Sequence, residues 1–300
     1  MKIFAHDRRD SALVLLGLLQ PVVLAWATLA FGRHSTGETL GLGALLVFWV
    51  CTNYQCIAHN FLHTPFFSAR WLNSLFSVVN SLGLGIPQSL YRVHHLHHHK
   101  FNNDAVDPAT GTTRDQTSTY RYSTTPPAEE GILTYSLLGP FRSDVGFLVE
   151  GARRQGRIRL AALEGVALAV MALALAVLNF KGFLFFFMPV WYLGSCASLA
   201  ENYLEHHGAR PGSRLTDSVS SYGPVYNFIW FNNGYHQEHH FRPQMHWTQV
   251  PALRPQLPPS SERRVAPWAH WFNFEPIVRR FAQSGEGAPA GSKVGGSAAA

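Results

Sequence analysis

The sequence has 300 residues, of which 47% are hydrophobic and 14% are charged, and its formal net charge is +6. Its three cysteines, Cys51, Cys56 and Cys196, include no closely spaced pair, which argues against a disulfide framework and against an iron–sulfur domain. Many basic residues flank apolar segments, a pattern that anionic lipid headgroups explain, and we therefore expect no nucleic acid partner.

Four apolar segments are long enough to cross a membrane. Residues 11–31 contain no charged side chain, and about 20 residues at ~1.5 Å rise per residue cross the ~30 Å hydrocarbon layer as a helix. Residues 39–58, 160–180 and 182–200 repeat this pattern, and Glu164 is the only charged residue in these three segments. The sequence therefore predicts an all-α, multi-pass membrane protein with about four transmembrane helices.

A weaker apolar segment, residues 75–90, lies between the second and third predicted spans. It contains Gly83, Gly85 and Pro87, which interrupt a regular helix. We expect this segment to enter and leave on one side of the membrane, or to lie at its surface. Four crossings then place both termini on the same side.

Lysine and arginine are distributed unevenly between the segments that join the spans. The first span is preceded by Lys2, Arg8 and Arg9, and the third by Arg153, Arg154, Arg157 and Arg159. The two short loops on the opposite side carry only Arg33 and Lys181. Because basic loops stay in the cytoplasm, we expect the termini and the long insert on the cytoplasmic side.

The polar regions are expected to form a helical cap on that side. The insert, residues 101–157, has a turn-rich part, 104–130, and a short apolar piece, 132–141, which is expected to lie on the membrane surface. Residues 1–281 are expected to form a single membrane-embedded domain. Residues 282–300 have low complexity and are expected to be disordered.

Twelve of the 16 histidines fall into four clusters, each next to an apolar segment or in the predicted cap. Helical spacing places side chains at i, i+3 and i+4 on one face, so the histidines within a cluster can converge. The clusters are His59 and His63; His94, His95, His97, His98 and His99; His206 and His207; and His236, His239 and His240.

Nine of these histidines can be drawn together, two from the first cluster, three from the second, one from the third and three from the fourth. One zinc ion takes about four ligands, so nine imidazoles suit two ions with higher coordination numbers and open positions for dioxygen. Imidazole also suits zinc, copper and nickel, so ligand type does not identify the metal. A metal-buffering loop is the non-enzymatic alternative, but it would need no partner clusters elsewhere.

The ordered motifs HNFLH, HLHHH, NYLEHHG and HQEHH resemble those of the integral-membrane di-iron family of fatty acyl desaturases, alkane monooxygenases and carotenoid oxygenases. The resemblance covers roughly residues 40–245. It implies two non-haem iron ions at the cytoplasmic face, with dioxygen as co-substrate, acting on an unactivated C–H bond. The implied ligands are His59, His63, His95, His98, His99, Asn202, His206, His236, His239 and His240.

Some details of the motifs depart from individual family members. Asn60 stands where alkane monooxygenases carry glutamate, and HNFLH is shorter than the first box of stearoyl-type desaturases. The second box can be aligned with His95 or with His94 as its first ligand, and we take His95, with His94 as the alternative. NYLEHHG resembles the alkane monooxygenase box, whereas Asn202 four residues before His206 resembles the acyl desaturases.

Other polar residues are expected to support the site or to lie at the surface. His207, His246 and His270 are expected to be supporting or surface residues. Outer partners that hold ligand imidazoles in one tautomer are expected among the acidic residues. The candidates are Glu205, Glu238, Asp104, Asp107 and Asp217.

The resemblance implies an oxidoreductase that desaturates a fatty acyl chain in the membrane. An alkane or fatty-acid hydroxylase is the close alternative, and a carotenoid ketolase or hydroxylase comes next. The sequence shows no flavin, haem or iron–sulfur motif, so the electrons must come from a ferredoxin, a rubredoxin or a b-type cytochrome with its reductase. Spacing does not reveal chain length, regiochemistry or the choice between desaturation and hydroxylation.

Overall fold

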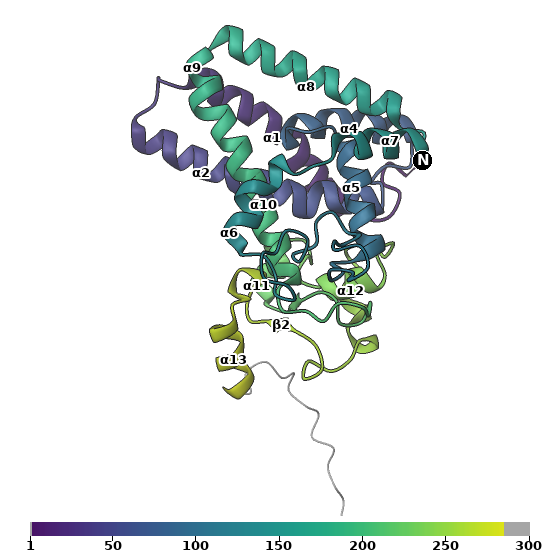
Figure 1. Ribbon diagram of the computed structural model, residues 1–300. Helices are drawn as coiled ribbons and strands as arrows, with labels where there is room; N and C mark the ends of the chain where they lie inside the picture. The colour runs from purple at the N-terminus through teal and green to yellow at the C-terminus, as the bar shows by residue number, and fades with distance from the viewer. Residues whose placement is uncertain (1, 285–300) are drawn as a thin grey trace, which may run out of the picture.

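The structure, a computed structural model, describes residues 2–284 and is mostly helical (Figure 1). Strand structure in this part of the chain is limited to β1 (Ser220–Ser221) and β2 (Val265–Ala266), which pair in parallel. The expected disordered tail lies outside the described residues, except that α13 (Glu275–Ser284) includes residues 282–284.

Within residues 2–284, four helices are long and apolar enough to cross a membrane, which agrees with the predicted number of spans. Two of them contain a π-helical turn, in which the backbone takes up one extra residue. The spans are α1 (Asp10–Ala30); α2 (Thr36–Thr52), which continues through Asn53–Ala58 into α3 (His59–His63); α8 (Ile158–Leu178); and α9 (Phe180–Gly182), which continues through Phe183–Phe187 into α10 (Met188–His206).

The second and fourth spans extend beyond the limits expected from hydropathy. They end at His63 and His206 instead of at residues 58 and 200. The added turns carry buried polar side chains that are covered by the cap, so the helices continue although the sequence is no longer apolar. Histidines therefore lie on the same continuous helices that cross the membrane.

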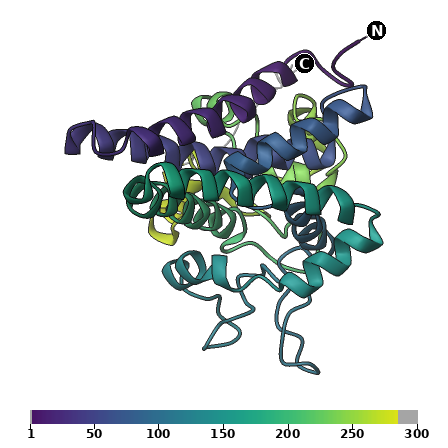
Figure 2. The same ribbon diagram turned by 90° about the horizontal axis from the view of Figure 1, so that it is seen from above.

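Helices α4 (Arg70–Leu84) and α5 (Gln88–Phe101) occupy the weaker apolar segment and the second histidine cluster. They are joined at Gly85, whose φ of 76° is left-handed, and a Cβ there would lie 1.9 Å from the Trp191 ring. Helix α4 packs between α1 and α8 (Figures 1 and 2). As expected, α4 and α5 are not among the helices able to span a membrane.

Glu164, the single charged residue noted in the predicted spans, is fully buried and receives hydrogen bonds from two other helices. Ser77 on α4 donates to its carboxylate at 2.6 Å. The backbone N–H of Ser89, in the first turn of α5, donates to it at 2.8 Å, and the Ser89 hydroxyl at 3.0 Å. A carboxylate at a helix N-terminus satisfies free amides and complements the helix dipole, so Glu164 fixes the start of α5.

Further buried polar contacts connect this carboxylate to the other spans through Gln88, whose amide donates to Ser77 at 3.2 Å. Asn80 and Asn53 exchange reciprocal amide hydrogen bonds of 2.9 Å, and Asn53 also donates to Gln20 on α1 at 2.5 Å. Asn80 donates to Gln88 on α5 at 2.6 Å. In an apolar environment such groups are costly unless paired, so the network sets the positions of these helices.

The cap lies at one end of α10 and is built from short helices and ordered loops (Figure 1). Asp10, at the start of α1, binds it through His246 Nε2 at 3.0 Å and Trp247 Nε1 at 2.8 Å. Its elements are α6 (Ile132–Leu138), α11 (Pro224–Ile229), α12 (His236–Phe241) and the 3-10 turns Gly139–Phe141, Val250–Gln256 and His270–Phe272. Helix α7 (Val145–Arg154) packs instead on α5 and α8.

Candidate metal centre

The four histidine clusters meet where α3, α5, α10 and α12 converge beneath the cap. The spacing predicted one face per helix, and the structure places the side chains in that way. All nine histidines in the predicted set are at least nine-tenths buried. They are His59, His63, His95, His98, His99, His206, His236, His239 and His240.

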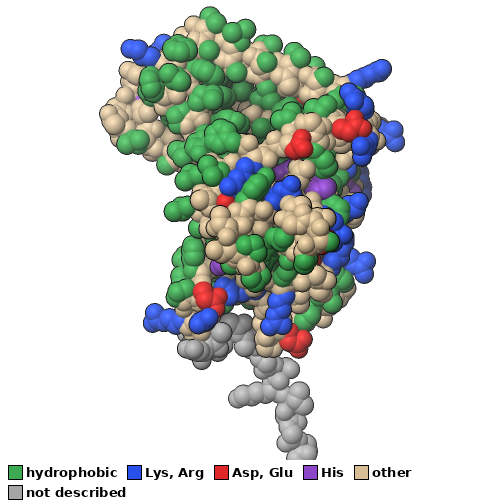
Figure 3. Space-filling view, in the orientation of Figure 1, with side chains coloured by type: hydrophobic (Ala, Val, Ile, Leu, Met, Phe, Trp, Pro, Cys, Tyr) green, Lys and Arg blue, Asp and Glu red, His purple; other side chains and the backbone are tan. Residues whose placement is uncertain are grey.

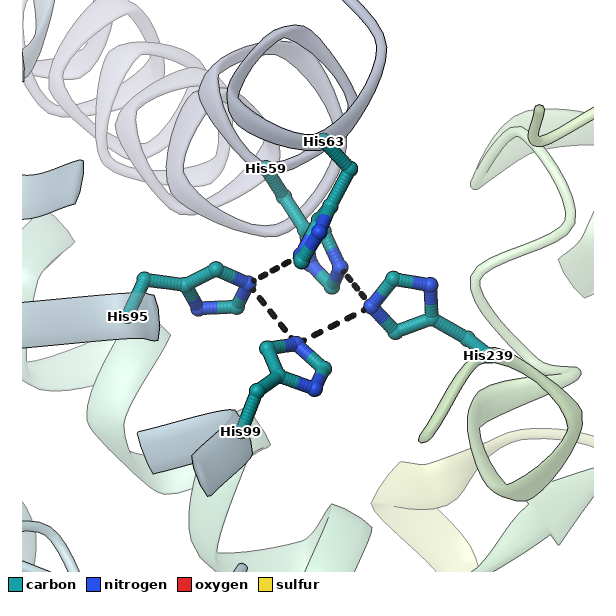
Figure 4. Close-up of side chains that lie close together, drawn as sticks. All are labelled: His59, His63, His95, His99 and His239. Carbon is teal, nitrogen blue, oxygen red and sulfur yellow. Dashed lines mark hydrogen bonds between the residues drawn. The ribbon is translucent and has the colours of Figure 1, made fainter. Parts of the chain in front are cut away.

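Five of these imidazoles form a first group, whose Nε2 atoms point toward one another (Figure 4). His59 and His239 approach to 2.7 Å, and His63 and His95 to 2.8 Å. His99 lies 3.0 Å from His95 and 3.1 Å from His239. One ligand atom from each of the five residues lies within 4.8 Å of all the others.

Hydrogen bonds alone do not account for the first group. A neutral imidazole nitrogen carries either one hydrogen or one lone pair. Nevertheless, Nε2 of His95, of His99 and of His239 each faces two other Nε2 atoms. The Nδ1 atoms of His59, His63 and His99 have no hydrogen-bond partner among the described residues. Convergent nitrogens of this kind fit a cation, which accepts several lone pairs at once.

Three histidines form a second group, and their outer contacts define which nitrogen carries the hydrogen. Nδ1 of His98 donates to Asp115 at 2.7 Å, and Nδ1 of His206 donates to the backbone oxygen of Asp217 at 3.1 Å. Nδ1 of His240 donates to Asn102. Since each neutral ring then has a lone pair on Nε2, three lone pairs face one another, as a metal site requires.

His236 lies at the edge of the second group. Its Nε2 is 3.4 Å from Nε2 of His206, and its Nδ1 is 3.6 Å from the carboxylate of Glu205. Glu205 is held in turn by the amide of Asn233 at 2.6 Å. With His236 included, the structure brings together all nine histidines that the sequence singled out.

The protonation of four of these rings suits metal binding. Burial, followed by the neighbouring imidazoles, lowers the pKa of His95, His99, His239 and His240 well below the usual value, so these rings are neutral near pH 7. His98 differs, because the Asp115 carboxylate outweighs the effect of burial and raises the pKa of His98. Neutral imidazole is the form that ligates metals.

The outer partners differ from those expected. Asp115, which the sequence did not single out, accepts from His98, whereas Asp104 accepts backbone N–H bonds from Arg114 and Asp115 within the same loop. Asp217 accepts from His206 through its backbone oxygen. Its carboxylate accepts a hydrogen bond from Asn102, which in turn accepts from His240.

Two further acidic candidates have no contact with a ligand histidine. Glu238 is fully buried and binds Ser220 and Tyr222, each at 2.6 Å. Asp107 is exposed and closes a turn with Ala109. Of the five acidic residues proposed, only Glu205 faces a ligand histidine through its carboxylate.

The remaining residues of the histidine motifs lie outside both groups. His94 lines the cavity next to His95 and is not in either group, which favours the alignment that starts with His95. Nε2 of His97 donates to the backbone oxygen of Arg114 at 2.9 Å. Asn202 donates its amide to Tyr135 at 2.8 Å and lines the same cavity as His98 and His236.

His270 proves to be part of the interior, and not of the surface. It is fully buried, and its ring centroid is 5.8 Å from that of His236. Glu201 and Glu205 each approach its Nδ1 to 3.5 Å. Burial alone would lower the pKa of His270, but the hydrogen bonds and charges of these carboxylates raise it to about 9. A cationic His270 thus balances two carboxylates behind His236.

His207 and His246 also have fixed partners. His207 binds Glu129 and is half-buried, and His246 is buried against Asp10. Neither contact involves a histidine of the two groups.

A cavity of about 160 Å³ leads from the surface to the histidines. His59, His95, His98 and His236 form part of its wall. Ile86, Trp191 and Leu199 make one side apolar, and Gln116, Ser118 and Arg142 provide polar groups. The cavity therefore offers both apolar and polar contacts to a molecule that lies beside the histidines.

The fatty acid desaturase family model matches residues 38–272 of this chain. The chain belongs to the fatty acid desaturase family. This desaturase-family protein is 24% identical over 263 residues to sphingolipid delta(4)-desaturase DES1 of Drosophila melanogaster, an alignment that covers 84% of this chain and 76% of the relative.

Two fungal relatives have shorter alignments. The sphingolipid delta(4)-desaturase of Candida albicans is 25% identical over 221 residues, which cover 65% of this chain and 56% of the relative. The sphingolipid delta(4)-desaturase of Schizosaccharomyces pombe is 30% identical over 96 residues, covering 29% of this chain and 26% of the relative. The family match confirms the resemblance that the histidine motifs indicated. It supports a metal-dependent membrane oxidoreductase that acts on lipids.

Proposed function

We propose that this protein is a membrane non-haem di-iron oxidoreductase that uses dioxygen to desaturate a long hydrocarbon chain of a lipid. The observation that carries the proposal is the second group, in which His98, His206 and His240 donate Nδ1–H outward and turn Nε2 lone pairs inward. The first group provides five further nitrogens beside it. Together with the desaturase family, this arrangement favours two metal ions in one buried centre.

The first group would hold one iron ion through His59, His63, His95, His99 and His239. The second group would hold the other, with His236 beside it. Asn202 stays in the proposed ligand set through its amide oxygen, because its amide nitrogen is committed to Tyr135. When bound, the two irons with dioxygen would supply an oxidant able to remove hydrogen from a C–H bond, which no side chain can do.

The chain itself would bind the substrate, orient it and exclude water. The apolar side of the cavity, with Ile86 and Trp191, would hold the hydrocarbon, and the polar side would hold the head of the lipid. Asp115, Asp217 and Asn102 would keep the imidazoles in their ligating tautomers, which prepares the site before substrate arrives.

Desaturation is favoured over hydroxylation because the three relatives are desaturases by name. Their names also make a sphingolipid the first substrate to test. Hydroxylation is the second candidate, since NYLEHHG resembles the alkane monooxygenase box. Both reactions begin by removing one hydrogen, and the position of the chain relative to the irons determines the product.

The metal centre and both termini are proposed to face the cytoplasm, on the basis of the basic residues that flank the first and third spans. Electrons would come from a ferredoxin, a rubredoxin or a b-type cytochrome with its reductase. The exposed side chains of Arg153 and Arg154 belong to the basic face that an acidic donor would contact.

Mass spectrometry of lipid extracts tests the function directly. Cells that express the wild-type chain or the His236→Ala variant are supplied with iron and an electron-donating reductase. We expect a loss of two hydrogens in a ceramide or acyl chain, only with the wild-type chain. A gain of one oxygen would select the hydroxylase, and equal product in the His236→Ala cells would refute the proposed ligand set.

A further inference from the structure

One flank of the cap exposes a cluster of large apolar side chains. Phe228 is 85% exposed, Val225 is 69% exposed and Trp268 is 55% exposed. Large exposed apolar patches mark binding surfaces. We call this cluster the α11 patch, and it comprises Val225, Phe228, Ile229, Trp268, Trp271 and Phe272.

The α11 patch has a fixed backbone. Gly223, just before α11, packs so closely on the Trp268 segment that a Cβ there would lie 1.9 Å from the Trp268 carbonyl oxygen. Trp268 itself has a left-handed φ of 59°, which is uncommon for a bulky residue. Two segments more than 40 residues apart are therefore locked together, and they present their apolar side chains as one surface.

The α11 patch continues the lipid-facing surface of the spans. The Trp271 ring lies 6.2 Å from that of Phe48 on α2, and Phe48 is 40% exposed within a membrane span. Trp271 also lines an apolar groove between α2 and α10, together with Val47 and Leu193. In Figure 3 hydrophobic side chains continue from the upper part of the molecule down the left edge toward the region of α11 in Figure 1.

The apolar helix α6 and the turn after it support the same placement. It packs along α10 and exposes Leu133 by 73%. The 3-10 turn that follows it packs on α10 as well, where Gly139 closely approaches Leu199, and exposes Phe141 by 76%. Two separate parts of the cap thus expose apolar side chains beside the same end of α10. If both areas faced water, the hydration of these apolar side chains would cost free energy.

We propose that the α11 patch is inserted into the boundary between the headgroups and the acyl chains of the leaflet next to the cap. Its partner is the lipid bilayer. Tryptophan and phenylalanine favour this boundary, and no acidic side chain belongs to the α11 patch, so neither charge repulsion nor the cost of burying a carboxylate opposes insertion. Arg280, exposed on the neighbouring α13, provides a positive charge for anionic headgroups.

Site-directed spin labelling of the full chain in vesicles tests the proposal. Phe228→Cys carries one nitroxide, and Thr110→Cys, in an exposed loop of the cap, carries the matched control. The native Cys51, Cys56 and Cys196 are buried, and the wild-type chain treated with the same reagent measures any background. The vesicles contain phosphatidylcholine and phosphatidylglycerol.

We expect the nitroxide at position 228 to collide more often with oxygen, which concentrates in the bilayer, than with a water-soluble nickel chelate. The label at position 110 should show the reverse. Equal accessibility profiles at the two positions would overturn the proposal, and so would spin–spin broadening between 228 labels, which would indicate a second copy of the chain. Val225→Cys provides a second site on the α11 patch if Phe228→Cys does not fold.

Discussion

Asp115 and His98 form a buried hydrogen-bonded pair, in which Nδ1 of His98 donates to the carboxylate at 2.7 Å. The same carboxylate accepts the backbone N–H of Asn103 at 2.9 Å, directly after α5 ends. One side chain therefore orients a proposed ligand and fixes the turn that follows it. Burial alone would raise the pKa of Asp115, but His98 and the backbone N–H groups of Thr117 and Asn103 lower it. The side chain is therefore a carboxylate near pH 7.

Asp115→Asn is expected to weaken iron binding and turnover by about 10–100-fold, because the amide oxygen is a poorer acceptor for the His98 ring than a carboxylate. Metal analysis of the purified protein, together with lipid mass spectrometry, measures both effects. Asp107→Asn is the matched control, since Asp107 is exposed and contacts no histidine, and it should leave both unchanged. Normal iron content in Asp115→Asn would contradict this role.

The second histidine box can be tested by comparing two adjacent residues. His95→Ala should abolish turnover and lower the iron content, because Nε2 of His95 lies between those of His63 and His99. His94→Ala should retain its iron, since His94 lines the cavity outside both groups. The reverse result would establish the alternative alignment of the box.

Glu164→Leu is expected to destabilise the protein by roughly 1–3 kcal/mol, because it leaves the Ser89 N–H and two serine hydroxyls without their buried acceptor. Glu164→Gln keeps one acceptor oxygen and should cost less. Thermal unfolding in detergent measures the difference. Leu173→Ala, at a 66% exposed position of the same helix, should change the unfolding temperature little. Equal unfolding temperatures for wild type and Glu164→Leu would show that the carboxylate does not hold α5.

Removal of the metal should lower the unfolding temperature, because the converging lone pairs then have no cation between them. Iron added at about 100 times its dissociation constant should restore about 2.7 kcal/mol of stability. Calcium prefers oxygen ligands and should have no effect. The shift should be reduced in His206→Ala and kept in His207→Ala, because the His207 side chain pairs with Glu129 and lies outside both histidine groups. An iron-dependent shift of equal size in both variants would argue against His206 as a ligand.

Sequence patterns predicted the spans and the histidine set well, because both depend on local periodicity. Uninterrupted apolar runs revealed the four spans found among the described residues, and helical spacing grouped eight of the nine histidines that converge, to which His206 was added from its own cluster. Gly85 and Pro87 correctly indicated that the weaker apolar segment is interrupted.

The outer contacts escaped prediction because they depend on how distant segments meet. Asp115 lies in a turn-rich loop with no periodic signal, and nothing local shows that it reaches His98. His270 lies in a short 3-10 turn, and only the fold places it between Glu201 and Glu205. The ends of α3 and α10 were predicted too early. The hydropathy of the sequence falls where these helices leave the membrane, but the cap buries the polar side chains of the added turns, so the helices continue.

The 2.7 Å approach of His59 to His239 joins residues 180 positions apart in the chain. Ribosomes add about 5–20 residues per second, so the two rings are synthesised some ~10–40 s apart. During that interval the first histidine box is already in the membrane without its partners from α12. Assembly of the centre must therefore follow insertion of the last span, and iron delivery becomes a late step in the biogenesis of the protein.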